Sequence, residues 1–171
     1  RQMCIRDRFK RVDYTLSIDG TDKVIEYQRR GANWDTVQEN AIKINQNFGA
    51  VVNHVITAVN VFNFVKLVEW FHKHNFDLVI LSLENTTLHL KLSAIPDELK
   101  KQLIADIITA KNNYDNGSVY ANMLDQMIDI LNSFEFKPEV LKAFVQRIKI
   151  EDQESKHPLV DVVPEWRPYF E

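Results

Sequence analysis

Apolar and polar residues alternate along several short segments in the first half of the chain. Residues 12–19 read V-D-Y-T-L-S-I-D, a strict period of two that is typical of a β-strand with one polar face. Residues 51–59 are rich in β-branched side chains and residues 76–83 form an apolar run, so both segments predict strands. A shorter alternation over residues 87–92 predicts a fourth strand.

Apolar residues at helical spacing separate the first three of these strands. Residues 34–47 carry an apolar stripe that starts directly after Asn33, a residue type that caps helix N-termini. Residues 64–74 repeat the helical spacing before the third strand. The order strand, helix, strand, helix, strand predicts parallel strands joined by right-handed crossovers, and therefore an α/β fold.

The pattern changes at Pro96, a residue type that is common in the first turn of a helix. Three amphipathic helices are predicted from there to residue 150. The tail contains three prolines and is predicted to be irregular. The predicted organisation is therefore a separate N-terminal stretch over residues 1–11, an α/β unit over 12–95, a helical extension over 96–150 and a tail over 151–171.

Composition restricts the chemistry open to the chain. Its 171 residues carry 21 Lys and Arg against 24 Asp and Glu, and Cys4 is the single cysteine. One cysteine cannot form an intrachain disulfide or an all-cysteine metal site. The four glycines form no G-x-G pair, and no P-loop is present, which excludes two common nucleotide-binding motifs. No apolar run approaches the ~20 residues of a transmembrane helix, so we expect a cytoplasmic protein without a membrane partner.

Charge is concentrated at the N-terminus. Residues 1–11 sum to +4, so the net charge of −3 leaves −7 for the rest of the chain. A basic arm is compatible with binding to nucleic acid or to an anionic surface. The alternative is an artificial or truncated start, because the sequence begins at Arg1 and its motifs begin only at Val12. We favour this alternative, which leaves nucleic acid as the weaker prediction for a partner.

Polar residues gather where the predicted parallel strands end, the position at which α/β folds bind ligands. Ser17, Asp19 and Gly20 end the first strand, Thr57 and Asn60 end the second, and Glu84 and Asn85 follow the third. The polar face of the first strand suits the lumen of an open or partial barrel, because a strand covered by helices on both sides is apolar on both faces. The alternative is an edge strand whose polar face is solvated.

Three further side chains have both a functional and a structural interpretation. Arg29 and Arg30 lie beyond the first strand and are suited to bidentate pairing with a carboxylate or a phosphate, whereas solvated surface arginine is the alternative. His54 lies within an apolar strand, which favours a hydrogen-bonded core histidine over a ligand.

Several short motifs occur in a characteristic order. They are Y-T-L-S-I-D-G-T over residues 14–21, E-Y-Q-R-R-G-A-N-W over 26–34, T-A-V-N-V over 57–61 and I-P-D-E-L-K over 95–100. Together with residues 144–152 and 162–165, this series resembles radical S-adenosylmethionine enzymes with a twitch-type C-terminal extension. The likeness covers about residues 12–168. Ser155 is a departure, because the subgroup usually has an arginine at this position.

The resemblance implies the C-terminal half of a partial (β/α)6 barrel followed by an all-helical extension. Such enzymes use a [4Fe–4S] cluster, held by a C-x3-C-x2-C loop, to cleave S-adenosylmethionine into a 5′-deoxyadenosyl radical that abstracts a substrate hydrogen. By this resemblance Ser17 would contact the ribose of the cofactor and Arg29 would pair with its carboxylate. Asp19 and Asn60 would line the same cavity.

The cysteine content departs from this family. Cys4 stands alone, so the cluster loop is missing from the chain. We therefore interpret the chain as a C-terminal portion that carries part of the S-adenosylmethionine cavity but no cluster ligand, and that is inactive alone. Its substrate, a peptide or a small molecule, is not determined by the sequence. An unpaired half-barrel edge predicts poor solubility or self-association.

Two alternatives to this function remain open. One is a cysteine-poor, non-catalytic module that keeps the fold and binds a protein partner through its amphipathic helices. The other is a different α/β barrel enzyme that binds a phosphate, which we rank last because the chain has no glycine-rich phosphate loop.

Overall fold

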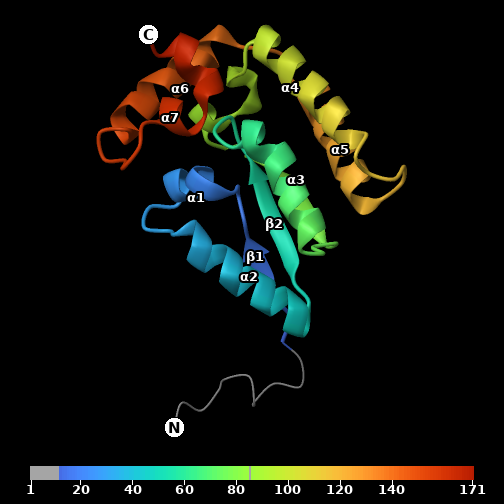
Figure 1. The fold of residues 1–171 in the computed structure, drawn as a ribbon. Coiled ribbons are helices and arrows are strands. Elements are labelled where there is room, and N and C mark those ends of the chain that lie inside the picture. The colour runs from blue at the N-terminus through green and yellow to red at the C-terminus, as the bar shows by residue number, and fades with distance from the viewer. Residues whose placement is uncertain (1–11, 85) are drawn as a thin grey trace.

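The computed structural model describes residues 12–84 and 86–171, which form a parallel sheet and a set of helices at one end of it (Figure 1). The strands are β1 (Thr15–Ser17), β2 (Val51–Ile56) and β3 (Val79–Leu83), hydrogen-bonded in the order β1-β2-β3. Both neighbouring pairs are parallel, which confirms the predicted α/β class. Each strand is shorter than its predicted segment. The basic N-terminal stretch, with both interpretations of its charge, lies outside the described residues.

Helices connect the strands, as predicted. Between β1 and β2 lie α1 (Asp22–Gln28) and α2 (Trp34–Phe48), and between β2 and β3 lie the short helix η2 (Val61–Asn63) and α3 (Phe64–Lys73). The predicted cap of α2 is confirmed, because the Asn33 side chain accepts a hydrogen bond from the Thr36 backbone N–H at 3.0 Å. The helix α1 was not predicted, because its seven residues bury only Val24 and Ile25 and so give too little periodic signal.

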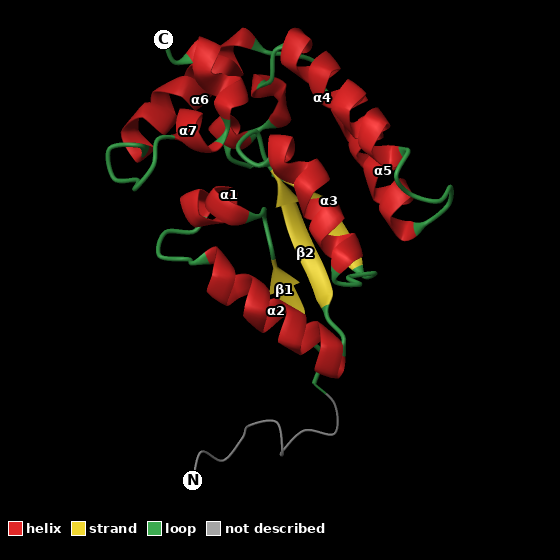
Figure 2. Ribbon diagram, in the orientation of Figure 1, coloured by secondary structure: helices red, strands yellow, loops and turns green. Residues whose placement is uncertain are grey.

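The helices α2 and α3 cover one face of the sheet (Figure 2). On β2 the alternate residues Val52, His54 and Ile56 are buried, and their neighbours on the opposite face are partly exposed. Trp34 of α2 and Trp70 of α3 have ring centroids 5.3 Å apart, so the two helices pack against each other on the buried side. Among residues 12–84 and 86–171, the sheet is therefore apolar and covered on one side only.

The other face of the sheet is open. Thr15 and Ser17 of the edge strand β1 are exposed, and Ser17 is in register with Asn53 of β2. Asn53 is in turn in register with Ile80 of β3, which is 54% exposed. The Ser82 hydroxyl donates to the Asn53 side-chain oxygen at 3.2 Å, which gives this face a polar centre. The predicted polar face of the first strand is thus exposed; both interpretations of it remain compatible with this arrangement.

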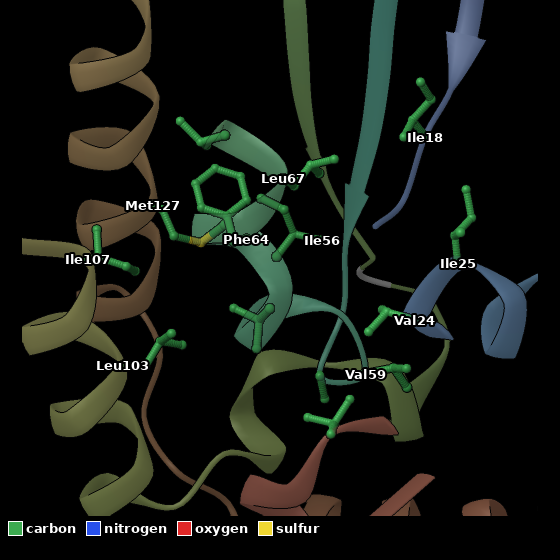
Figure 3. Packing of buried hydrophobic residues seen from close by; sticks show 14 of the residues in the cluster. Ile18, Val24, Ile25, Ile56, Val59, Phe64, Leu67, Leu103, Ile107 and Met127 are labelled. Atoms are coloured by element: carbon green, nitrogen blue, oxygen red, sulfur yellow. The ribbon is translucent and has the colours of Figure 1, made fainter. Parts of the chain in front are cut away.

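The hydrophobic core lies between the covered face and the C-terminal helices (Figure 3). Phe64 and Leu67 of α3 are fully buried, and Phe64 lies next to Ile56 of β2. Ile107 of α4 (Asp97–Lys111) and Met127 of α5 (Val119–Asn132) face the same cluster. The helix α3 therefore joins the sheet to the helical extension, so that the two predicted units share one core.

The helical extension agrees with the predicted pattern, whereas the predicted fourth strand is wrong. The helices α4, α5 and α6 (Pro138–Glu151) are the three amphipathic helices expected after Pro96. Residues 88–94 form two 3₁₀ turns, η3 (Leu88–Leu90) and η4 (Leu92–Ala94), in place of a strand. The Leu90 carbonyl accepts from the Ala58 N–H at 2.9 Å, so this segment crosses the end of β2 instead of pairing along β3. Among the described helices, none combines the length and apolar character needed to span a membrane.

The tail is more regular than predicted. It contains α7 (Leu159–Val162) and the 3₁₀ helix η5 (Pro164–Tyr169). Trp166 of η5 is 0% exposed, and its Nε1–H donates to the Ala58 carbonyl at 3.1 Å. Its ring packs against Phe62 and Phe144, with centroids 5.7 Å and 4.4 Å away. Pro158 caps α7, whereas Pro164 and Pro168 lie within η5 on either side of the buried Trp166. The tail therefore packs over the end of β2.

His54 is the core histidine that the sequence favours. Its ring is 0% exposed, and Nδ1 lies 3.0 Å from the Ile18 carbonyl, so Nδ1 carries the proton and donates. Nε2 has no hydrogen-bond partner within the described residues. Burial lowers the pKa of His54 below its ordinary value of 6.5, an effect that the Ile18 carbonyl and the charge of Asp19 oppose.

We expect this histidine to make folding sensitive to acid. The folded state holds His54 neutral, whereas the unfolded state takes up a proton below pH 6.5. The free energy of unfolding should therefore fall below this pH with a slope of up to ~1.4 kcal/mol per pH unit from this group. Denaturant unfolding between pH 7.5 and 5.0 measures the slope. His54→Gln should flatten it strongly, whereas His89→Gln should flatten it less, because burial also lowers the pKa of the partly exposed His89. Equal slopes in all three proteins would contradict the assignment.

Candidate functional site

Asp19 holds the point where β1 ends and the backbone leaves the sheet. The Ile18 N–H still donates to the Asn53 carbonyl of β2, at 3.3 Å. One step further, the Asp19 carboxylate takes the place of a backbone carbonyl, since its Oδ1 accepts from the Val55 N–H at 3.0 Å. The residue is only 8% exposed. The carboxylate thus continues the hydrogen-bond ladder beyond the last residue of β1.

The second oxygen of this carboxylate binds Arg29. Both Nε and Nη2 of Arg29 donate to Asp19 Oδ2, at 3.1 Å and 2.5 Å. Arg29 is the residue that caps the C-terminus of α1, so this helix returns the guanidinium to the strand end. The Arg29 side chain remains 46% exposed, against 12% for Asp19. The pair therefore has a buried anion and an accessible cation.

Gly20 allows the start of α1 to lie close to Asn63 of η2. A Cβ at this position would lie 2.9 Å from Val24 Cγ1 and 3.1 Å from Asn63 Oδ1, both too close for an ordinary side chain. The Thr21 N–H donates to Asn63 Oδ1 at 2.7 Å, which ties the start of α1 to the start of α3. The S-I-D-G segment is thus explained by contacts: the aspartate extends the ladder and the glycine allows the close approach.

Asn60 closes the turn that follows β2. Its Oδ1 accepts from the Thr57 N–H at 2.9 Å, and its Nδ2 donates to the Val55 carbonyl at 2.8 Å. The residue is 1% exposed, so both polar ends of the amide are used inside the turn. Thr57 Oγ1 in turn accepts from Gln28 Nε2 at 3.3 Å, which links the turn to the end of α1. Asn60 therefore shapes the end of β2, and its amide is not free for a ligand in this conformation.

Ser17 and Glu84 are the accessible polar groups at the remaining strand positions. Ser17 is exposed, and its hydroxyl has no hydrogen-bond partner within residues 12–84 and 86–171. The Glu84 carboxylate accepts from the Thr86 hydroxyl and from the backbone N–H groups of Thr86 and Thr87. These hydrogen bonds, led by that of the Thr86 hydroxyl, lower the pKa of Glu84 to about 2. The rim thus presents a free hydroxyl on β1 and a fixed negative charge after β3.

The four residues predicted to contact the cofactor separate into two groups. Asp19 and Asn60 are buried and make internal hydrogen bonds, whereas Ser17 and Arg29 are accessible. All four lie at the carboxyl ends of β1 and β2 or on the segments that directly follow them. The structure therefore brings together the strand ends as predicted, and leaves one hydroxyl and one guanidinium available to a ligand.

A cleft lies between α1 and the loop that follows α6. It consists of two hollows, of about 430 Å³ and about 310 Å³. Tyr27, Arg30 and Ser155 line both hollows, so the two share a wall. The smaller one also touches Gln28 and His89 near the strand ends. Sequence patterns gave no signal for this cleft, because its walls come from segments about 125 residues apart and one of them is the unpredicted helix α1.

Tyr27 of α1 connects the two walls of the cleft through a hydrogen bond to Asp152. Its hydroxyl donates to Asp152 Oδ1 at 2.8 Å, and the same oxygen accepts from the Leu159 N–H at 3.0 Å. Burial, reinforced by the neighbouring Asp152 carboxylate, raises the pKa of Tyr27 well above its usual range. The phenol therefore stays protonated and remains a donor. Ser155, the departure from the family pattern, makes its hydrogen bonds to the backbone of His157.

The described residues do not offer ligands for an iron–sulfur cluster. No group of three or more His, Cys, Asp or Glu side chains in this part of the chain is arranged to hold a metal ion. The single cysteine of the sequence, Cys4, lies outside the described residues. Comparison with protein-family models, with curated proteins and with solved structures finds no match for this chain.

Proposed function

We propose that the chain forms the C-terminal part of a radical S-adenosylmethionine enzyme and contributes one side of its cofactor cavity. The observation that carries the proposal is the end of β1. There an exposed hydroxyl, that of Ser17, lies on the open face of a parallel sheet, and a half-exposed guanidinium, that of Arg29, is held by a buried carboxylate. These are the two side chains that the motif resemblance assigns to the ribose and the carboxylate of the cofactor.

The open face of the sheet supports the same proposal. Parallel strands with helices on a single side are the arrangement found in β/α barrels, whose other side faces the lumen. The open face carries Ser17, Asn53 and Ser82 along its middle, so a ligand there would meet hydroxyl and amide groups. In this proposal the uncovered edge of β1 pairs with the strands that complete a partial barrel.

The residues present fit part of the cofactor. The Arg29 guanidinium is suited to the carboxylate of S-adenosylmethionine and the Ser17 hydroxyl to a ribose hydroxyl. Asp19 acts as a positioning residue, because it restrains Arg29 without being exposed itself. When bound and reductively cleaved, S-adenosylmethionine supplies the radical that abstracts a substrate hydrogen. The cluster needed for this cleavage does not fit the described residues, so its ligands must come from other sequence.

The proposal predicts that Arg29 contributes directly to affinity for S-adenosylmethionine. Arg29→Ala should weaken binding by at least about tenfold, because it removes a charge-assisted pair to the carboxylate. Isothermal titration calorimetry on the intact chain measures the effect. Arg167→Ala, which removes another half-exposed arginine paired with an aspartate, is the matched control and should leave affinity unchanged. Equal affinities of the Arg29→Ala variant and the unchanged chain would remove Arg29 from the site.

The coding sequence upstream of Val12 gives an independent test. We expect it to encode, in the same reading frame, a loop of the form C-x3-C-x2-C and further β/α units. A reading frame that starts near residue 1 with no such loop before it would reject the enzymatic proposal, whatever the binding result.

A protein-interaction module is the second candidate, and exposed apolar residues on the open face favour it. Ile80 lies on the edge strand β3 and is 54% exposed, and Leu78, directly before this strand, is 63% exposed. Burial of these two side chains in an interface would remove their apolar surface from water and so stabilise the complex. A monodisperse chain with a cooperative thermal transition would support the module, whereas self-association of the isolated chain would support the half-barrel.

A further inference from the structure

The larger hollow of the cleft is lined by an excess of positive charge. Lys23 extends from α1, Arg30 from the loop before α2, and Lys156 from the loop after α6. Two carboxylates oppose these three cations. Glu26 accepts a hydrogen bond from the Trp34 N–H at 2.9 Å, and Glu154 pairs with Arg30. The lining residues thus sum to +1 in a protein whose net charge is −3, so this charge does not follow from a generally basic surface. The Asp152 carboxylate lies behind this lining, where it accepts the hydrogen bond of the Tyr27 hydroxyl.

The three cations differ in whether they have an ion-pair or hydrogen-bond partner. Neither Lys23 nor Lys156 has a hydrogen-bond or ion-pair partner among the described residues, and both are exposed. The pair of Arg30 and Glu154 is open to solvent, with side chains 58% and 70% exposed, so its formation contributes little to stability. Glu154 belongs to a loop and is free to leave Arg30 to another anion. Glu26 is less free, because it satisfies the first N–H of α2.

We propose that this hollow binds a small molecule through a phosphate monoester group. When such an anion replaces Glu154 at Arg30 and the exposed Glu154 side chain turns out into solvent, three cations and Glu26 line the site, which leaves +2. A phosphate monoester carries −1.5 to −2 at pH 7 and matches this charge, whereas a carboxylate neutralises only half of it. A volume of about 430 Å³ accommodates the phosphate together with the group that bears it. The site does not use Ser17 or Arg29, so it is independent of the proposed S-adenosylmethionine cavity.

Inorganic phosphate is the probe that tests the site. Titrated into the isotopically labelled chain at constant ionic strength, it should produce saturable shifts of the backbone amide resonances of Gly31 and Ser155, which line the hollow. Acetate at the same ionic strength should produce much smaller shifts, because it carries a single charge. Shifts that do not saturate, or equal effects of acetate and phosphate, would overturn the proposal.

Charge variants separate this site from general attraction of anions to lysine. Lys23→Ala combined with Lys156→Ala should weaken phosphate binding at least about tenfold, since two of three cations are lost. The control pair Lys73→Ala and Lys101→Ala removes the same charge from exposed positions outside the hollow and should change affinity less than about twofold. Equal weakening by both pairs would contradict the proposal.

A third variant should raise the affinity for phosphate, and it should have little effect on the stability of the fold. Glu154→Gln removes the competitor of Arg30 from an exposed ion pair and should tighten phosphate binding about threefold. Circular dichroism melts confirm that each variant keeps the fold. A Glu154→Gln protein that binds phosphate no better than the unchanged chain would show that Arg30 takes no part in the site.

Discussion

Trp166→Ala is expected to lower the free energy of unfolding by about 4 kcal/mol, the largest effect of a single substitution that we predict. The indole is fully buried between Phe62 and Phe144, so truncation leaves a cavity lined by aromatic rings. It also removes the donor to the Ala58 carbonyl at the end of β2. Denaturant unfolding followed by far-ultraviolet circular dichroism measures the loss.

Two variants make this result specific to Trp166. Trp166→Phe keeps most of the aromatic packing but loses the hydrogen bond, and should cost about 1–2 kcal/mol. Arg167→Ala changes the exposed neighbouring residue and should alter stability by less than about 0.5 kcal/mol. If Trp166→Ala is as stable as Arg167→Ala, the tail is not anchored as described. A large effect would establish that the tail, residues 151–171, belongs to the fold that holds the strand ends in place.

Asp19→Ala is expected to cost about 2 kcal/mol, because it leaves the Val55 N–H without its charged acceptor in a partly buried position. The substitution also removes the partner of Arg29. That loss contributes less, since the guanidinium is 46% exposed and water screens its interactions. The unfolding free energy measured in denaturant should therefore depend mainly on the hydrogen bond to β2.

A comparison of three variants separates these contributions. Asp19→Asn retains an oxygen for the Val55 N–H and should cost about 1 kcal/mol. Arg29→Ala should cost less than about 1 kcal/mol, as expected for a half-exposed ion pair. The double variant Asp19→Ala with Arg29→Ala should then be nearly as stable as Asp19→Ala alone. A larger cost for Arg29→Ala than for Asp19→Ala would contradict the role of the carboxylate as an extension of the ladder.

The same distinction matters for function. Arg29→Ala should keep the fold and weaken binding of S-adenosylmethionine, whereas Asp19→Ala perturbs both the strand end and the position of the guanidinium. A stable Arg29→Ala protein is therefore the cleaner test of the proposed cavity. Substitution of the buried Asn60 would, like that of Asp19, also perturb the fold, because both of its polar atoms make hydrogen bonds in the turn after β2.

Most helices and strands of the fold could be predicted from the local pattern of apolar and polar residues. The alternation over residues 12–19 predicts which side chains of β1 are polar, and Thr15 and Ser17 are indeed exposed. Asn33 as the cap of α2 and the helices after Pro96 follow from composition and spacing alone. The alternation over residues 87–92 was misleading, because two successive 3₁₀ turns also expose and bury residues in short intervals.

Only part of the candidate site could be predicted from the sequence. The position of Ser17 and Asp19 at a strand end follows from sequence, as does the presence of an arginine after the turn. That Arg29 reaches back to Asp19 depends on α1, a helix too short to show a clear periodicity. The cleft beside it depends on the hydrogen bond between Tyr27 and Asp152, which joins residues 125 positions apart.

By itself the sequence determined the α/β class, the parallel direction of its strands, the polar face of β1 and the lack of a three-cysteine loop within these 171 residues. The periodicity of side chains carries this information, because it records which face of each element meets water. Only the tertiary structure decided that Asp19 and Asn60 are buried, that Ser17 and Arg29 are accessible, and that the tail closes over β2 through Trp166. These features arise from contacts between distant segments, whose geometry is set by how the elements pack and leaves no periodic trace in the chain.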